Sequence, residues 1–184
     1  MFKQIKPNQV ERFVGAGLVK GNQRYHKLSG EYVTDRGVES FLAYFVAQPF
    51  RRFFSAKKSC VLLEVSRSEL EKKYVGATKL SRRFSPRGRF DIVFLGKAGQ
   101  DGLDHAAIGI IELKREQGYA SGYEKDIKRL ASIVGDFRTN KMFQFGCFAG
   151  VVSEKRKDKG SIEKQRSEWT AFMKSTAKQS RIKV

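Results

Sequence analysis

Apolar residues at helical spacing predict two amphipathic helices in the middle of the chain. The first has apolar residues at i, i+3, i+4, i+7 and i+8 from Val38 onward. Thr34 or Asp35 can cap this helix, and Pro49 predicts its end. The second helix is predicted from residue 122 to about residue 135, again with its apolar side chains on one face.

Several runs of apolar residues have the length and composition of β-strands. Glycine and aspartate in the segment 96–102 predict a hairpin loop between the second and third strands, and residues 69–74 predict a helical turn. The main elements therefore follow the order helix, strand, strand, strand, helix, strand, which is an α/β pattern. The predicted strands span residues 60–65, 89–94, 110–114 and 142–152.

The two ends of the chain have weaker patterns. A short amphipathic segment from Val10 to Val14 is followed by glycines, and we predict a polar loop from there to Gly30. Near the other end, a charged linker precedes apolar residues at helical spacing, which predict a C-terminal helix that packs on the core. The length of 184 residues fits one domain. Its predicted parts are an N-terminal extension (1–33), a core (34–152) and a basic linker with a C-terminal helix (153–184).

Two of the predicted strands have charged residues where apolar side chains are expected. Asp91 lies in one strand, and Glu112 and Lys114 lie in the next. We expect the strands to pair antiparallel, with Gly96 opposite Ala107. Counting five residues away from the loop on each strand then places Asp91 opposite Glu112, with Cβ atoms about 5 Å apart. Lys114 lies on the same face as Glu112, because side chains alternate along a strand.

Two carboxylates at this separation need a counter-charge. Mg²⁺ is commonly held by one or two carboxylates, with water and substrate phosphate completing its shell. The ion polarises a phosphoryl group, and a nearby lysine can neutralise developing charge. This set of residues therefore predicts hydrolysis of a phosphodiester. The alternative is structural, with Glu112 and Lys114 forming a solvated ion pair at a strand end and Asp91 serving as a turn residue.

The aspartate and the following Glu-Leu-Lys segment resemble the PD-(D/E)xK nuclease superfamily, which includes many restriction endonucleases, archaeal Holliday-junction resolvases and lambda-type exonucleases. The resemblance covers roughly residues 34–152. It implies an αβββαβ restriction-endonuclease-like core with a mixed central sheet flanked by helices, and we expect helical extensions at the N- and C-terminal ends of this core. It also implies that Asp91 and Glu112 are metal ligands and that Lys114 is the catalytic lysine.

Members of this superfamily often have a further acid on the helix before the first core strand. Glu39 fits that place, and Glu64 is a competitor for the same role as a metal ligand. Phe90 stands where the proline that names the superfamily would be, a departure that many members tolerate.

The chain is strongly basic, with a formal net charge of +18 and a pI near 10.1. Such a charge attracts polyanions, because Lys and Arg neutralise phosphates and so supply most non-specific affinity for nucleic acid. No run approaches the roughly 18 apolar residues of a spanning helix, and the first residues lack the apolar core of a signal peptide. We therefore expect a cytoplasmic protein without a membrane partner, in which Cys60 and Cys147 are buried, reduced thiols.

Basic residues and aromatic residues indicate where nucleic acid could bind. Phe53, Phe54 and Phe84 lie among arginines and lysines and are candidates for base stacking, although core packing is the default explanation for a phenylalanine. We expect the phosphates beside the cleaved bond to contact the basic segment that leads into the strand of Asp91, whose cations are Lys79, Arg82, Arg83, Arg87 and Arg89.

These observations predict a Mg²⁺-dependent nuclease, which Mn²⁺ should also support. The resemblance favours DNA over RNA as the substrate. It also favours a structure-selective or nonspecific endonuclease, because nothing resembles a separate target-recognition domain. The sequence does not fix the oligomeric state, and a homodimer is one possibility. The alternative from another class is a non-catalytic basic nucleic-acid-binding protein that retains the nuclease fold.

Overall fold

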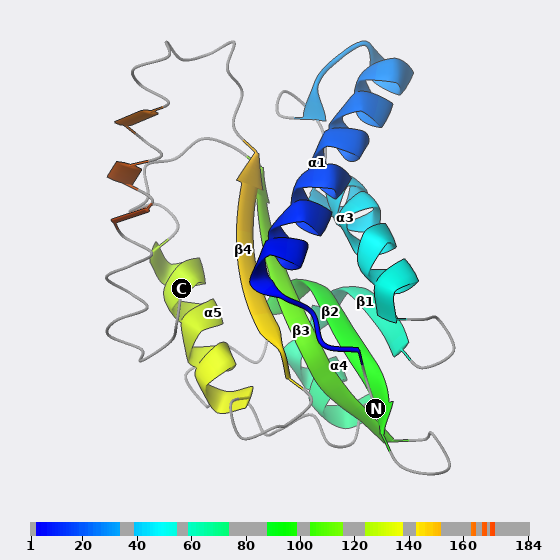
Figure 1. Ribbon diagram of the computed structural model, residues 1–184, viewed down its shortest axis with the longest axis vertical. Coiled ribbons are helices and arrows are strands. Elements are labelled where there is room, and N and C mark those ends of the chain that lie inside the picture. The colour runs from blue at the N-terminus through cyan, green and yellow to red at the C-terminus, as the bar shows by residue number, and fades with distance from the viewer. Residues whose placement is uncertain are drawn as a thin grey trace.

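A four-stranded mixed sheet lies at the centre of the structure, which is a computed structural model (Figure 1). The strands lie side by side in sequence order. β1, β2 and β3 are antiparallel, whereas β4 is parallel to β3. The α/β class predicted from the sequence is therefore confirmed. The strands are β1 (Ser59–Ser66), β2 (Arg89–Ala98), β3 (Asp104–Arg115) and β4 (Phe145–Val151).

The structure describes most of the chain in seven long segments and three short helical pieces. The long segments are residues 3–33, 39–54, 59–73, 88–98, 104–115, 124–137 and 143–151. The short pieces are residues 163–164, 167–168 and 170–171. These pieces fall where the C-terminal helix is predicted. The predicted charged linker and the first part of the helix expected from Thr34 lie outside the described residues.

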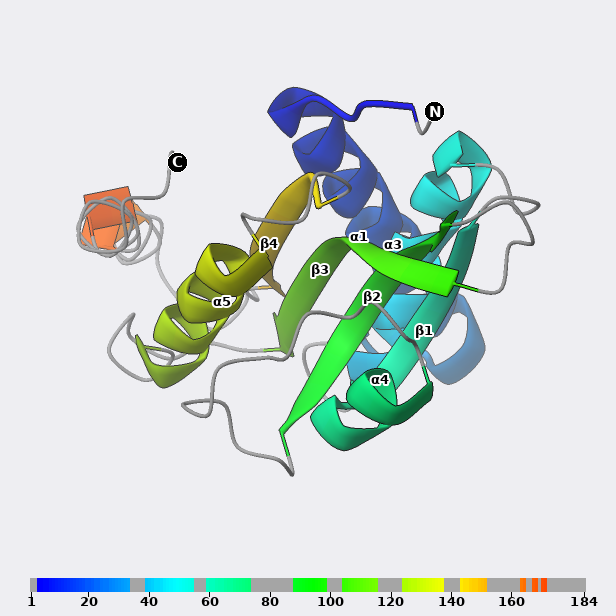
Figure 2. The ribbon, with the colours of Figure 1, turned by 90° about the horizontal axis from the view of Figure 1, so that it is seen from below.

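Helices cover both faces of the sheet, as Figure 2 shows. On one face, α1 (Pro7–Ser29) and α3 (Glu39–Phe54) enclose a core with side chains of β2 and β3. On the other face, α4 (Arg67–Lys73) and α5 (Glu124–Phe137) belong to a second apolar cluster. Because β4 runs parallel to β3, the chain needs a crossover between them, and α5 is part of that crossover.

The register of the hairpin formed by β2 and β3 differs from the prediction near the loop. Gly96 pairs with Ala106, one residue away from the predicted partner Ala107. A bulge next to Phe94 absorbs the extra residue. Beyond the bulge, Ile92 pairs with Ile111, which is the register that the predicted pairing of Asp91 and Glu112 requires.

The expected N-terminal helical extension is confirmed, but the polar loop predicted within it is wrong, because residues 7–29 form the long helix α1. Gly17 and Gly21 are buried against α3 and leave room for the close approach of the two helices. A Cβ atom at Gly17 would lie 2.5 Å from Val46 Cα, and one at Gly21 would lie 3.0 Å from a methyl group of Leu42. Helix–helix packing therefore outweighs the poor helix propensity of these glycines.

The predicted end of the first core helix before Pro49 is also wrong. α3 continues through Pro49 to Phe54. Proline removes a backbone hydrogen bond within a helix, but Phe50 and Phe54 on the following turn are fully or almost fully buried. Their rings contact Phe94 of β2, with ring centroids 4.7 and 6.3 Å away. Burial of these rings is the gain that offsets the lost hydrogen bond.

Two further sequence expectations concern the thiols and the membrane. Cys60 and Cys147 are partly buried, and neither is in a disulfide. Burial raises the pKa of the Cys147 thiol to about 12, and the Glu11 carboxylate contributes to this increase. Within the described residues, no helix is both long enough and apolar enough to cross a membrane.

The packing of α1 on α3 can be tested with two glycines that lie two positions apart. We expect Gly17→Ala to destabilise the fold by about 1–3 kcal/mol, because the added methyl group meets the α3 backbone. Gly15 faces open space on the same helix. Gly15→Ala should therefore stabilise the protein by about 0.5–1 kcal/mol through helix propensity. Urea unfolding measures both changes, and equal effects at the two positions would contradict the close helix contact.

Candidate active site

Charged side chains from four elements meet near the start of β2 and the end of β3. Asp91 belongs to β2, whereas Glu112 and Lys114 belong to β3. Glu39 is the first residue of α3, and Asp126 and Arg129 lie one helical turn apart on α5. The six residues are linked by ion pairs and electrostatic interactions, so we refer to them as the charged cluster.

Asp91 is held in place by the backbone of β3. The backbone N–H of Leu113 donates a hydrogen bond to Asp91 Oδ2 at 2.7 Å. The regular pairing of β2 with β3 ends at Ile92 and Ile111, so the Asp91 side chain supplies the next link between the strands. Burial raises the pKa of Asp91, although the Leu113 N–H and the Lys114 ammonium act in the opposite direction. The nearby Glu39 carboxylate adds to the increase.

Glu112 is the most deeply buried charged residue in the cluster, with only 1% of its side chain exposed. Burial raises its pKa to about 8, because removal from water penalises the carboxylate form. Arg129 opposes this shift, with Nη2 at 2.7 Å from Glu112 Oε1, and Asp91 adds to it. The Arg129 guanidinium also lies within hydrogen-bonding distance of Glu112 Oε1, and this contact helps to lower the pKa. Arg129 thus offsets part of the cost of burying this carboxyl group, through its charge and through this close contact.

Lys114 joins the two helical layers at the edge of the cluster. Its Nζ atom is 3.9 Å from Glu39 Oε2 and 3.8 Å from Asp126 Oδ2. About one fifth of the Lys114 side chain is exposed. Both ion-pair distances are longer than a typical hydrogen bond, so Lys114 lies between two carboxylates without close contact to either.

Glu39 and Glu64 were the two candidates for a further acidic metal ligand, and the structure distinguishes them. Glu39 interacts electrostatically with Asp91 and pairs with Lys114. Glu64 is exposed on β1, where its positive φ of 51° interrupts the pairing of β1 with β2. The structure therefore brings Glu39, and not Glu64, into the charged cluster.

Sequence reasoning missed both residues that α5 contributes. Arg129 Nη1 is 3.4 Å from Asp126 Oδ1, so the two side chains support each other across one turn of the helix. In the sequence they resemble ordinary polar residues on the outer face of an amphipathic helix. Only their spacing of three residues and the acidic first turn were visible signals. Their role depends on how α5 packs against β3.

The carboxylates of the charged cluster could serve as ligands of a metal ion. Among the described residues, no group of three or more His, Cys, Asp or Glu side chains is arranged to hold a metal. Asp91 and Glu112 form a pair of carboxylates, and Mg²⁺ can be bound through one or two carboxylates when water and phosphate supply its other ligands. This pair of carboxylates fits such an ion in chemical type, but the Arg129 guanidinium already lies 2.7 Å from Glu112 Oε1, so an ion at this oxygen would have to displace it.

Only one cation of the basic segment predicted to bind phosphate can be located. Arg89 is exposed at the start of β2, two residues before Asp91. The predicted phosphate contacts at Lys79, Arg82, Arg83 and Arg87 lie outside the described residues, as does the stacking candidate Phe84. Arg89 therefore places at least one exposed positive charge beside the cluster.

Comparisons with protein-family models, with curated proteins and with solved structures found no match for this chain.

The buried carboxyl group of Glu112 predicts how stability changes with pH in the absence of divalent cations. Its pKa is raised from 4.5 to about 8, so the native state binds this proton more tightly than the unfolded chain does. The contribution of Glu112 to stability should be highest below about pH 4.5 and should fall as the pH rises toward 8. The slope from this one group is at most about 1.4 kcal/mol per pH unit.

Urea unfolding in EDTA at several pH values measures this dependence. Glu112→Gln keeps the shape of the side chain but cannot ionise, so its stability should fall less over the same interval. Identical pH profiles for the wild type and Glu112→Gln would contradict a raised pKa at this position.

Proposed function

We propose that this protein is a Mg²⁺-dependent nuclease of the PD-(D/E)xK type. The observation that supports the proposal best is the convergence of Asp91, Glu112 and Lys114 with Glu39 at one end of the hairpin. The order of elements, with three antiparallel strands, a helix and a parallel strand, is also compatible with a restriction-endonuclease-like core.

In this proposal each residue of the cluster has a distinct role. Asp91 and Glu112 would hold the ion, which supplies Lewis-acid chemistry at the phosphoryl group when bound. Lys114 is close enough to orient a water molecule or to neutralise charge that develops on the phosphate. Glu39 and Asp126 lie on two sides of the Lys114 ammonium and keep it at the edge of the cluster.

The proposed substrate is nucleic acid, with DNA favoured over RNA by the resemblance to the superfamily. The net charge of +18 supports binding to a phosphate backbone of either kind. Nothing in the given sequence resembles a separate target-recognition domain, so we propose a structure-selective or nonspecific endonuclease. Mn²⁺ should replace Mg²⁺, because it accepts the same oxygen ligands.

A second candidate function is non-catalytic binding of nucleic acid, and the Arg129–Glu112 ion pair favours it. A guanidinium group 2.7 Å from Glu112 Oε1 already supplies a positive charge to the buried carboxylate. A protein that used this cation permanently would have no need for a metal. Against this alternative, Asp91, Glu112 and Lys114 are all present, whereas loss of catalysis commonly removes at least one such residue.

The carboxylates can be tested by separating metal binding, cleavage and nucleic-acid binding. Asp91→Ala and Glu112→Gln should abolish Mg²⁺-dependent cleavage of plasmid DNA, but both variants should still retard DNA on a gel. Mg²⁺ should raise the unfolding temperature of the wild type, because a ligand that binds only the native state stabilises it. This effect should be absent in Asp91→Ala. Full cleavage by either variant would exclude the two-carboxylate site, whereas binding without any cleavage by the wild type would favour the second candidate.

Lys114 can be compared with another lysine of the same charge. Lys114→Ala should lower the cleavage rate by about 10²-fold, as loss of an electrostatic catalytic group commonly does. Lys125 is exposed on α5 and has no proposed role in the chemistry. Lys125→Ala should leave the single-turnover rate unchanged. Similar rates for the two variants would show that Lys114 is only one positive charge among many.

A further inference from the structure

The outer face of α3 differs from an ordinary solvated helix face. The inner face of this helix is filled by apolar side chains that point into the core. Three aromatic residues lie on the opposite side in the first half of the helix, and two arginines follow on the last turn. In order, the outer residues are Phe41, Tyr44, Phe45, Arg51 and Arg52.

The aromatic residues form a continuous row that includes one ring from α1. Tyr25 of α1 contacts Phe41, Phe41 contacts Phe45, and Phe45 contacts Tyr44, with ring centroids 5.5, 5.1 and 5.3 Å apart. Tyr44, at the end of this row, is 56% exposed. An exposed ring that other rings hold in place costs little conformational entropy when a flat partner stacks on it.

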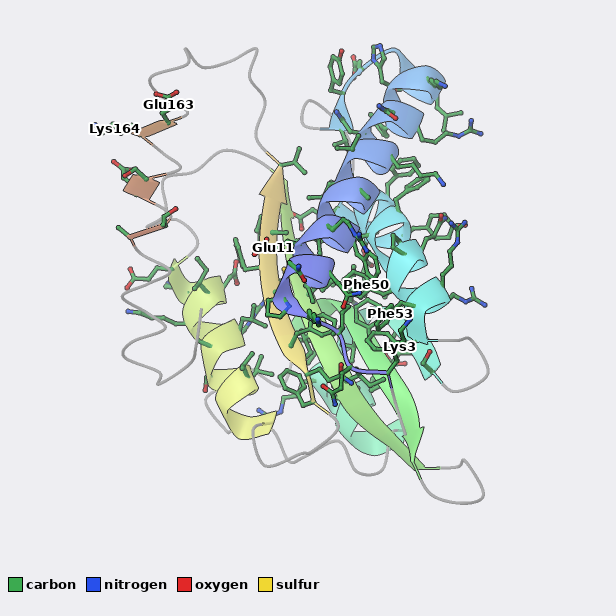
Figure 3. The ribbon with its side chains drawn as sticks, in the orientation of Figure 1. Lys3, Glu11, Phe50, Phe53, Glu163 and Lys164 are labelled. Carbon is green, nitrogen blue, oxygen red and sulfur yellow. The ribbon has the colours of Figure 1, made fainter. Side chains whose placement is uncertain are left out.

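Phe53 and Phe54, which the sequence suggested as platforms for base stacking, are less accessible than Tyr44. Phe54 is only 4% exposed and belongs to the core. Phe53 contacts Phe13, and the Lys3 ammonium lies 4.4 Å from its ring centroid, as Figure 3 shows for Lys3 and Phe53. Stacking of bases on these two rings would require Lys3 or the core to move, so Tyr44 is the better platform.

Both helices that supply the aromatic row also have exposed cations. Arg51 and Arg52 lie on the same helix, and Lys20 and Arg24 lie on the turns of α1 next to Gly21, which packs against Phe45. Each of the two helices contains a single acidic residue. Glu39 begins α3, and Glu11 lies on the side of α1 that faces β4 (Figure 3). Positive charge on this outer surface is therefore not offset by acids of the same helices.

We propose that this surface of α1 and α3 binds single-stranded nucleic acid. Unpaired bases stack on Tyr44 and on the exposed edges of the neighbouring rings, and the phosphates pair with the arginines and lysines around them. A duplex is a poor match for this surface, because its bases are already stacked and cannot lie on the rings.

The position of Glu39 connects this surface with the charged cluster and so extends the proposed function. Glu39 and Tyr44 are five residues apart on one helix, which corresponds to about 7.5 Å along its axis and about 140° around it. A strand bound on Tyr44 would therefore have to pass around the first turn of α3 to reach the cluster. The proposed binding of single strands does not depend on the nuclease function. The further idea that this surface directs a substrate toward the charged cluster rests on the proposed nuclease function.

The test measures binding in EDTA, so that cleavage plays no part. Fluorescein-labelled oligothymidylate, oligouridylate and a mixed-sequence DNA duplex serve as probes. Tyr44→Ala should weaken binding of the single strands by about 5- to 100-fold, which corresponds to the loss of one stacked base. Tyr44→Trp should bind about as tightly as the wild type, and the duplex affinity should change by less than about 3-fold for either variant. The two single strands show whether DNA or RNA binds better.

Charge is tested separately with two matched double variants. The pair Arg51→Gln and Arg52→Gln should flatten the dependence of log K on log salt by about 1.4 units for a single strand. The pair Lys125→Gln and Lys128→Gln removes the same charge from exposed positions on α5 and should leave the slope almost unchanged. Because Tyr44 is largely exposed, urea unfolding should show the same stability for Tyr44→Ala as for the wild type.

Three outcomes would overturn the inference. Wild-type affinity of Tyr44→Ala for both single strands would exclude stacking on this ring. Equal losses for single strands and duplex would exclude selectivity for unpaired bases, and equal salt slopes for the two double variants would place the phosphates elsewhere. If binding follows the prediction but Mg²⁺ supports no cleavage of any probe, the surface is correct and the nuclease function is wrong.

Discussion

The burial of the Glu112 carboxyl group constrains the arrangement around it. A carboxylate removed from water is costly unless it is protonated, paired or bound to a metal. The pKa of about 8 and the contact with Arg129 show the first two of these responses in one residue. Arg129 can reach Glu112 only because α5 packs on this face of the sheet, so the position of the crossover helix and the state of one carboxyl group depend on each other.

The sequence predicted the central hairpin well, because burial on both faces gives strands with few polar residues. Charged residues within such a run are conspicuous, and Asp91, Glu112 and Lys114 could be recognised without a structure. The predicted register was wrong at Gly96 and correct at Ile92, since a bulge near Phe94 shifts one strand by a residue. A bulge of this kind depends on how the sheet bends and packs, which the alternation of side chains does not encode.

Residues whose role depends on packing between elements were not predictable. Gly17 and Gly21 lower the helix propensity of α1, and only their contact with α3 shows why they are favourable. Pro49 is tolerated because the turn after it buries Phe50 and Phe54. Asp126 and Arg129 are similar cases in the candidate site, because their contacts follow from the position of α5 and not from any local pattern.

The charged cluster has residues from all three layers of the fold, which are the α3 side, the sheet and the α5 side. The charge balance within the cluster therefore depends on the positions of both helical layers. Lys114 lies between Glu39 of α3 and Asp126 of α5, so the same ammonium group responds to both helical layers. A shift of either helix changes the field at Asp91 and Glu112, because Glu39 and Arg129 each act on one of these carboxylates. A ligand that binds along α3 would act first on Glu39, the residue where that helix meets the cluster. The nucleic-acid surface that we propose on α1 and α3 would therefore be connected to the charge balance at the hairpin through the first turn of α3.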